Sequence, residues 1–505
     1  MNDSKTAGKD LSGIKNKAAF ALVFIYAAAV FAMNLIRIFD NEFWSDEVYS
    51  IMLSRMHLFD MISETASDVH PPLYYLFLMM LRNMLGDHGW VYHLAALIPF
   101  AFVLVFILTV LYKRFGFGSA LIMITLCGLS ENALNYNIEV RMYSLAFMFV
   151  LFSFYELLRV LEGKKNAGAL FILFSLGAAY SHYYALISVA FFYIAILINV
   201  IRKKLELKKL YVIYGVTVIG YLPWLVKAVV TLLRTKNDFW MKEIPGIRDL
   251  IKYFYLTDNK WYSYAMFVLT FALAAYVIIR GRRERAAGVS DKGADAVGSM
   301  ETDAAGAGLE KNASGVSADS VSVWLICGLS SAVFTCVIGE AVSYIVRPVF
   351  TFRFIYPVVS VMWMVLAASV SFLKKKETAG IVIAAVSLVF FLPGYRFIYT
   401  YDRITDKLCL ETMENASQVI KPGDVLITND SHMDWMLLDY YVPGHEHEYT
   451  EDLDISFDEN NSYVLVWSDV LSGDEINILS EKGYEAEPEI IDGLLGDRVN
   501  IYRLS

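Results

Sequence analysis

Long apolar runs recur between residues 18 and 397, and they constrain the fold more than any other feature of the sequence. The first run, Ala18 to Ile36, carries no charged residue. A helix of roughly 20 apolar residues spans the hydrocarbon core of a bilayer. Of the 505 residues, 57% are hydrophobic, more than a water-soluble protein could bury. The sequence therefore predicts an α-helical polytopic membrane protein.

Lysine and arginine orient the predicted spans, because positive charge favours the cytoplasmic side of a membrane. Four lysines precede the first run, which predicts an uncleaved signal anchor with residues 1–17 in the cytoplasm. The apolar stretch 73–85 is short for a span. If it lies on the outer surface, the later basic clusters all fall inside. These clusters are Lys113–Arg114, Lys164–Lys165, Arg202 to Lys209, Arg280 to Arg285 and Lys374 to Lys376.

About eleven transmembrane helices follow from this assignment. They are expected at 18–36, 91–112, 118–134, 142–161, 167–181, 182–201, 210–232, 261–279, 321–345, 354–373 and 379–397. The first outer loop, 40–90, is expected to hold juxtamembrane helices, with 73–85 opened by Pro71 and Pro72. Residues 281–320 are rich in Ala, Gly, Ser and Asp, and predict a disordered cytoplasmic loop.

Residues 399–505 differ from the rest and predict a small extracytoplasmic α/β domain. Strands are expected at 424–428, 463–467 and 498–503, and helices at 433–441 and 475–483. Much of the net charge of −9 lies in this tail, so it gives no reason to expect a nucleic-acid partner. We interpret the domain as an acceptor-binding or packing module.

Unusual polar residues gather at the predicted outer ends of the spans, where ionisable groups usually face a cavity. The stretch FWSDEVYS places Asp46 beside Glu47 directly after the first span. The others are His70, Tyr74, Glu139, Arg141, Tyr143, His182, Tyr183 and Arg353. Each has a structural alternative: a solvated loop, an ion pair, a packing histidine, an interfacial tyrosine or an arginine that reaches toward headgroups. Their joint clustering favours an outward-facing site.

The segments FWSDEVYS, HPPLYY, ENALNYNIEVRMYSL, SHYYALI and RPVFTFRFIYPVV resemble, in order and spacing, the membrane glycosyltransferases of the GT-C superfold. The nearest resemblance is to the glycosyltransferase 39-like group, which contains protein O-mannosyltransferases and the lipid A aminoarabinose transferase. It covers residues 18–400 and implies a GT-C-like catalytic domain over 18–398. It also implies transfer of a sugar from a polyprenyl-phosphate carrier to an extracytoplasmic acceptor such as a cell-envelope glycan, glycolipid or protein.

The resemblance implies that Asp46 is the catalytic base, with Glu47 beside it. A lipid-phosphate leaving group needs no proton, but its negative charge needs a cation. Arginine suits this task, and Arg353 is preferred over Arg141. Glu139 is expected to orient Arg141 or bind sugar, and the two histidines to bind sugar or phosphate. One-step displacement predicts inversion at the anomeric carbon.

A metal is not expected to be required, because the sequence shows no obvious ligand cluster. Asp46, Glu47, Glu139 and His70 could hold one divalent ion if they converge. Two other functions stay open at this point: a transporter or flippase of lipid-linked sugars, and a non-catalytic assembly partner. A transporter should show related halves and charges near mid-membrane, whereas the charges here gather at the outer rim.

Overall fold

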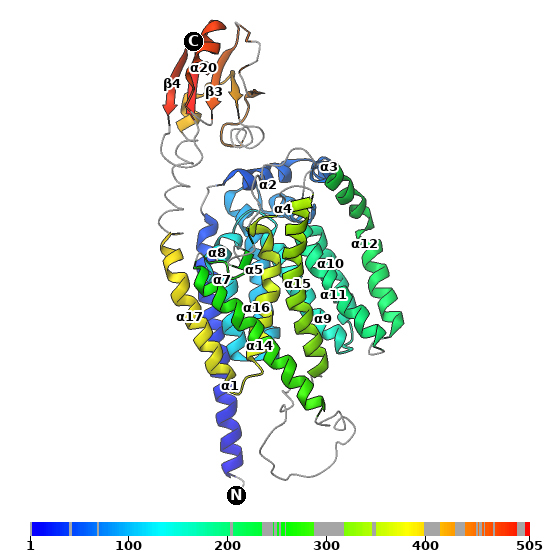
Figure 1. Ribbon diagram of the computed structural model, residues 1–505. Helices are drawn as coiled ribbons and strands as arrows, with labels where there is room; N and C mark the ends of the chain where they lie inside the picture. Colours follow the sequence, from blue (N-terminus) through cyan, green and yellow to red (C-terminus); the bar gives the residue numbers. More distant parts are fainter. Residues whose placement is uncertain are drawn as a thin grey trace.

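The structure is a computed structural model of the chain. It describes residues 3–39, 43–67, 70–202, 206–234, 246, 250–251, 254–257, 259–286, 318–345, 350–397, 415–429, 440–450, 453, 457–458, 460–467, 470–491 and 500–505. A bundle of helices makes up the body, with a β-sheet at its far end from the N-terminus (Figure 1). Most of the predicted cytoplasmic loop 281–320 and of the predicted helix 433–441 lies outside the described residues.

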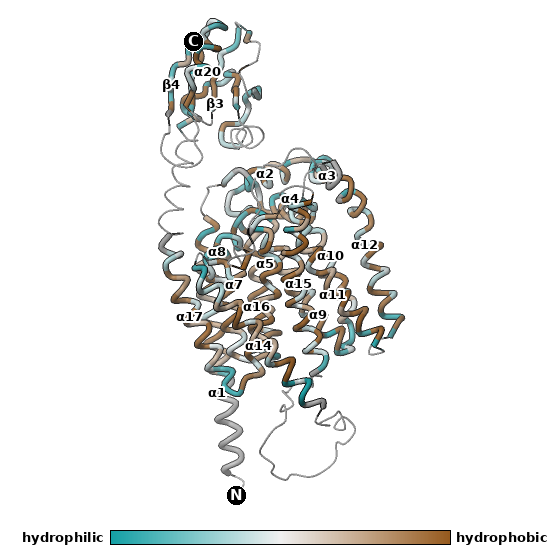
Figure 2. The backbone as a smooth tube through the Cα atoms, viewed as in Figure 1, coloured by the Kyte–Doolittle hydropathy of each residue, from teal (hydrophilic) through white to brown (hydrophobic). Residues whose placement is uncertain are grey.

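Within the described residues, nine helical stretches are long and apolar enough to cross a membrane. They are Lys17–Phe39, Gly89–Phe115, Tyr143–Leu161, Tyr183–Ile201, Leu207–Lys227, Lys260–Arg283, Asp319–Ile345, Arg353–Val370 and Lys376–Tyr395. Nine of the eleven predicted spans coincide with these stretches. Apolar residues occupy most of the length of the helices in Figure 2, whereas hydrophilic residues gather near the helix ends. The protein is therefore a multi-pass membrane protein, as predicted.

Figure 1 shows the helices of the bundle, coloured by their position in the sequence. They are α1 (Asp3–Leu35), α5 (Gly89–Phe106), α6 (Tyr112–Phe115), α7 (Phe117–Leu129), α9 (Tyr143–Leu161), α10 (Ala167–Ser181), α11 (Tyr183–Ile201), α12 (Leu207–Arg234), α14 (Lys260–Ala286), α15 (Ala318–Ile345), α16 (Tyr356–Val370) and α17 (Lys376–Phe397). Helices α9 and α16 are buried along almost their whole length, so they form the centre of the bundle.

Helices α7 and α10 correspond to the other two predicted spans, and both are short. At 1.5 Å per residue, the 13 residues of α7 extend only about 20 Å. The predicted span 118–134 was too long, because Ser130 adopts an extended conformation with ψ of 146° and ends α7. A separate helix, α8 (Glu131–Tyr136), follows. Both short helices pack within the bundle, α7 against α17 and α16, and α10 against α9 and α12 (Figure 1).

The first outer loop forms three helices at the end of the bundle away from the N-terminus (Figure 1). They are α2 (Ser45–Arg55), α3 (Leu58–Ser67) and α4 (Leu73–Leu85). Helix α4 begins directly after Pro72, as expected for a helix opened by prolines, and buries Tyr74, Tyr75 and Leu78. Helix α2 packs against α4, and α4 packs against α5. The loop therefore caps the bundle with helical structure.

The C-terminal residues form a five-stranded sheet of order β2-β1-β3-β5-β4. Its elements are β1 (Asp424–Thr428), β2 (Glu446–Tyr449), β3 (Ser462–Trp467), α20 (Gly473–Glu481), β4 (Ala486–Ile491) and β5 (Asn500–Leu504). Strand β1 pairs in parallel with β2 and β3, and β5 runs antiparallel to β3 and β4. The predicted α/β character is confirmed.

Both faces of the sheet are covered. Successive strand residues point to opposite sides and pack in two different clusters. Val425 and Leu465 pack in one cluster with Leu479 of α20. Leu426 and Val464 belong to the other cluster. The three predicted strands are present within a residue or two. Strands β2 and β4 were missed, because β2 reads EHEY with one apolar side chain and β4 contains Pro488.

Candidate active site

Asp46 and Glu47 lie in the first turn of α2, where negative charge interacts favourably with the helix dipole. The backbone N–H of Trp44 donates to Glu47 Oε2 at 3.3 Å and caps the helix. Successive residues of a helix are rotated by about 100° around its axis. The two adjacent carboxylates therefore point in different directions and make different contacts.

The Glu47 carboxylate is buried, with 5% of the residue exposed. Its Oε1 accepts a hydrogen bond of 2.7 Å from the backbone N–H of Val140. Val140 belongs to the loop between α8 and α9 that also carries Glu139 and Arg141. The ring of His93 on α5 fixes the same loop, because its Nδ1 lies 2.8 Å from the carbonyl oxygen of Ile138. Glu47 thus anchors this loop to the first turn of α2.

The Asp46 carboxylate lies between two guanidinium groups from distant parts of the chain. Its Oδ2 is 2.8 Å from Nη1 of Arg353 and 3.9 Å from Nη2 of Arg141. The guanidinium carbon of Arg353 lies 5.0 Å from the centroid of the Trp44 ring, in a cation–π contact. Asp46 and Arg353 keep 18% and 21% of their side chains exposed. Solvent or a ligand can therefore reach both side chains.

Arg141 is 3% exposed and is held in place by several neighbours. Its Nη1 donates to the backbone oxygen of Asp46 at 3.1 Å and to Oγ of Ser50 at 3.3 Å. Its Nη2 lies 3.5 Å from Nε2 of His70. Arg141 therefore joins α2, the segment before α4 and the loop after α8, and it brings positive charge to the buried side of Asp46.

Glu139 is a titratable group whose pKa is shifted by this environment. Burial raises the pKa of Glu139 to about 7, while Arg353 and Arg141 lower it and Asp46 adds a smaller increase. Because burial disfavours the charged form, the carboxyl group exists in both protonation states near neutral pH. Glu139 can therefore donate a hydrogen bond below pH 7 and accept only above it.

His182 lies between α10 and α11 and is buried. Its Nδ1 accepts a hydrogen bond of 3.1 Å from the backbone N–H of Tyr184, so a neutral ring carries its proton on Nε2. Burial, His70 and Arg141 all lower the pKa of His182. Its ring centroid is 6.4 Å from that of His70 and 5.9 Å from that of Tyr143. The neutral imidazole is thus part of the same cluster.

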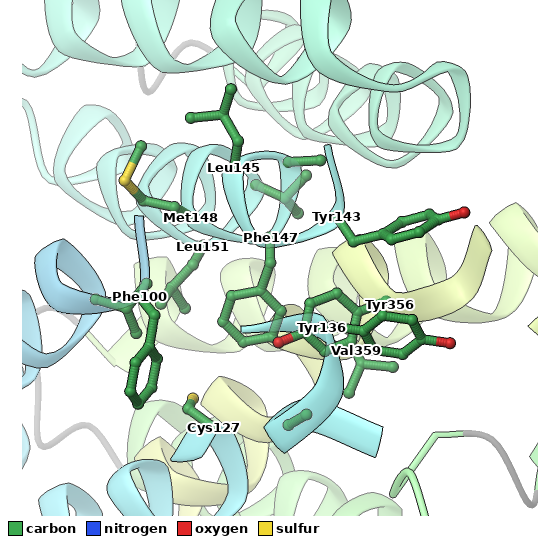
Figure 3. Packing of buried hydrophobic residues seen from close by; sticks show 14 of the residues in the cluster. Phe100, Cys127, Tyr136, Tyr143, Leu145, Phe147, Met148, Leu151, Tyr356 and Val359 are labelled. Carbon is green, nitrogen blue, oxygen red and sulfur yellow. The ribbon is translucent and has the colours of Figure 1, made fainter. Parts of the chain in front are cut away.

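Two tyrosine hydroxyls are buried beside these charges. Those of Tyr74 and Tyr143 have no hydrogen-bond partner among the described residues. The Tyr143 ring packs on Tyr136, which packs on Tyr356, and Tyr356 stacks on Phe147. Figure 3 shows this aromatic layer, with Tyr136 and Tyr356 beside Phe147. A buried hydroxyl without a hydrogen-bond partner is energetically costly. Tyr74 and Tyr143 are therefore candidates for binding a ligand.

The structure brings most of the predicted site residues together: Asp46, Glu47, His70, Tyr74, Glu139, Arg141, Tyr143, His182 and Arg353. Tyr183 differs, because it packs against Tyr221 and Trp224 in a separate cluster. Asp46, Glu47, Glu139 and His70 do not form a metal-binding group, since no set of three such ligands occurs among the residues that the structure describes. Sequence reasoning gave no role to Trp44, Ser50 or His93.

The bundle and its capping helices define a polytopic membrane protein. No family model matches the sequence, and no curated protein matches it significantly. Two solved structures of ArnT from Cupriavidus metallidurans are similar in fold. The apo structure is 10% identical with a TM-score of 0.58, and the structure bound to undecaprenyl phosphate is 11% identical with a TM-score of 0.54. Each match covers 96% of this chain and 98% of the other. The predicted resemblance is thus confirmed for the fold.

Proposed function

We propose that the protein is an integral membrane glycosyltransferase that moves a sugar from a polyprenyl-phosphate carrier to a hydroxyl group of an extracytoplasmic acceptor. The observation that carries this proposal is the Asp46 carboxylate, partly exposed and held between Arg353 and Arg141. The fold supports it, since an ArnT structure of the same fold contains undecaprenyl phosphate. A carboxylate beside an accessible guanidinium provides both groups that the reaction requires.

In the proposed reaction the acceptor oxygen attacks the anomeric carbon from the face opposite the phosphate. Asp46 takes the hydroxyl proton as the new C–O bond forms, while the bond between the anomeric carbon and the phosphate oxygen breaks. The electron pair leaves with polyprenyl phosphate, so no general acid is needed. A single displacement inverts the anomeric configuration.

Arg353 is the group that we assign to the donor phosphate. Its guanidinium is partly exposed, and phosphate can bind to its fork in place of the Asp46 carboxylate. The Trp44 ring supports the other side of the guanidinium. Exchange of Asp46 for phosphate would release the carboxylate to act as a base only when donor is present.

Arg141 and Glu47 are assigned to positioning. Arg141 is buried and directs its hydrogen bonds to Asp46, Ser50 and His70. Glu47 is occupied by the backbone N–H groups of Val140 and Trp44. We assign Tyr74, Tyr143, Glu139 and His182 to the sugar, because all four interact electrostatically with Arg141, which lies 3.9 Å from Asp46.

We also propose the membrane orientation: residues 1–17 in the cytoplasm, the 18–398 catalytic domain in the membrane, and the 399–505 domain outside with the active site. The basic clusters support this orientation, as does the position of α2 at the end of the bundle away from the N-terminus (Figure 1). Accessibility of single cysteines placed at Ser472 and Lys164 to an impermeant thiol reagent tests it. If intact cells label Lys164→Cys but not Ser472→Cys, the orientation is the opposite of the proposed one.

The activity is tested with purified protein in proteoliposomes and a panel of radiolabelled polyprenyl-phosphate sugars, offered with crude membrane acceptors. We expect sugar transfer with matching release of polyprenyl phosphate in the wild type, and neither in folded Asp46→Asn. Transfer that persists in Asp46→Asn would remove Asp46 as the base. Movement of labelled lipid across the bilayer without transfer would identify a flippase instead.

A further inference from the structure

The segment that leads into α2 is in contact with the C-terminal domain. Phe43 immediately precedes Trp44 and is 4% exposed. Its ring stacks on His93 with centroids 4.8 Å apart and meets the edge of Tyr440 at 5.8 Å. Phe43 thus lies between α5 of the bundle and residue 440 of the C-terminal part of the chain.

The hydroxyl of Tyr441 holds the backbone of Phe43. It lies 3.1 Å from the Phe43 nitrogen, whose N–H donates to it, and 3.4 Å from the Phe43 carbonyl oxygen, to which it donates. Phe43 lies outside the regular hydrogen bonding of α2, so these bonds satisfy backbone groups that the helix cannot. One tyrosine hydroxyl therefore holds both polar groups of this residue.

The other end of α2 is in contact with Tyr440. The guanidinium of Arg55, the last residue of α2, lies 4.9 Å from the centroid of the Tyr440 ring. Arg55 also pairs with Asp87 through two hydrogen bonds of 3.0 and 2.9 Å. Tyr440 and Tyr441 therefore contact both ends of the helix that carries Asp46.

We propose that Tyr440 and Tyr441 are positioning residues of the active site, through which docking of the C-terminal domain sets the position of Asp46. The connection is short: Phe43 is followed by Trp44, which supports Arg353, and Asp46 pairs with that arginine. A shift of Phe43 displaces the base in the first turn of α2, whereas Arg353 belongs to another segment of the chain. This role for the domain rests on the proposed function.

The test uses full-length protein in proteoliposomes and the variant Tyr441→Phe, which keeps the ring and removes the hydroxyl. Tyr463→Phe is the matched control, because its hydroxyl accepts a backbone N–H of Asp458 at 2.7 Å within the same domain. The variant loses both hydrogen bonds to Phe43, and each corresponds to about a 2- to 10-fold change in rate, or about 4- to 100-fold together. We expect kcat to fall by that factor in Tyr441→Phe, with the donor KM unchanged, and neither to change in Tyr463→Phe.

Amide deuterium exchange gives a second readout that does not depend on activity. We expect faster exchange in the first turn of α2 in Tyr441→Phe and wild-type exchange there in Tyr463→Phe. Unchanged exchange and unchanged kcat in Tyr441→Phe would overturn the inference, and so would equal losses in both variants. If the wild type transfers no sugar, the proposed function fails, and the exchange result alone decides whether the tyrosine pair positions α2.

Discussion

The roles of Asp46 and Glu47 can be separated by replacing each carboxylate with its own amide. Asp46→Asn removes the proposed base, and a general base contributes about 100- to 10,000-fold to a reaction rate. Glu47→Gln keeps an oxygen that can accept the 2.7 Å hydrogen bond from Val140, but it loses its charge and places an NH2 group against the N–H of Trp44. Charged hydrogen bonds contribute about 1.5–3 kcal/mol and neutral ones about 1 kcal/mol. The difference of roughly 0.5–2 kcal/mol predicts about a 2- to 30-fold fall in kcat.

The assay is initial-rate sugar transfer at saturating donor in proteoliposomes, with the amount of inserted protein determined for each variant. Glu47→Ala is the informative third variant, because it leaves the buried N–H of Val140 without its acceptor and should lose more activity than Glu47→Gln. If Glu47→Gln is as inactive as Asp46→Asn while still folded, Glu47 takes part in the chemistry. The assignment of Glu47 to positioning would then be wrong.

Three other predictions follow from the contacts. Arg353→Lys keeps the charge but loses the phosphate fork and the Trp44 contact, so donor KM should rise about 10- to 100-fold; an unchanged KM would contradict the phosphate assignment. The donor KM of the wild type should rise as pH increases through about 7, because Glu139 ionises beside Arg353 and its charge competes with phosphate; Glu139→Gln should lack this rise. Gly118→Ala should lower the midpoint of thermal unfolding, since a Cβ there would lie 2.6 Å from a backbone oxygen of α17, whereas Gly215→Ala, with no atom within 4 Å, should not.

The spans could be predicted from sequence because hydrocarbon imposes a strict length and composition on a crossing helix. The criterion of length and composition is weakest for the short helices α7 and α10. Glu377 of α17 accepts a hydrogen bond of 2.6 Å from the N–H of Gly118 at the start of α7. The Cα of Gly380 lies against Gly118, so the two helices cross closely there. Such contacts support a short helix within the bundle, and they depend on a partner that local sequence does not reveal.

The membership of the site could be predicted better than its geometry. Clustering at one end of the spans was enough to bring Arg353 near Asp46, because the topology places both at the same side. The contacts of Asp46 and Glu47 depend on where α2 begins. A shift of one residue in the start of the helix would rotate both carboxylates by about 100° and exchange their surroundings. Trp44 was missed for the same reason, since its contact with Arg353 requires the position of a residue far away in sequence.

The adjacency of Asp46 and Glu47 is itself a consequence of what the site requires. In the proposed reaction the acceptor must reach the base, and Asp46 keeps part of its side chain exposed. The Asp46 carboxylate must also stay close to Arg353, which is distant in the sequence. Glu47, rotated by one helical step, fixes α2 to the loop that carries Arg141. Glu47 thus holds Arg141 close to Asp46. Two acids separated further along α2 could not both reach their partners from the first turn, where the helix dipole also stabilises their charge.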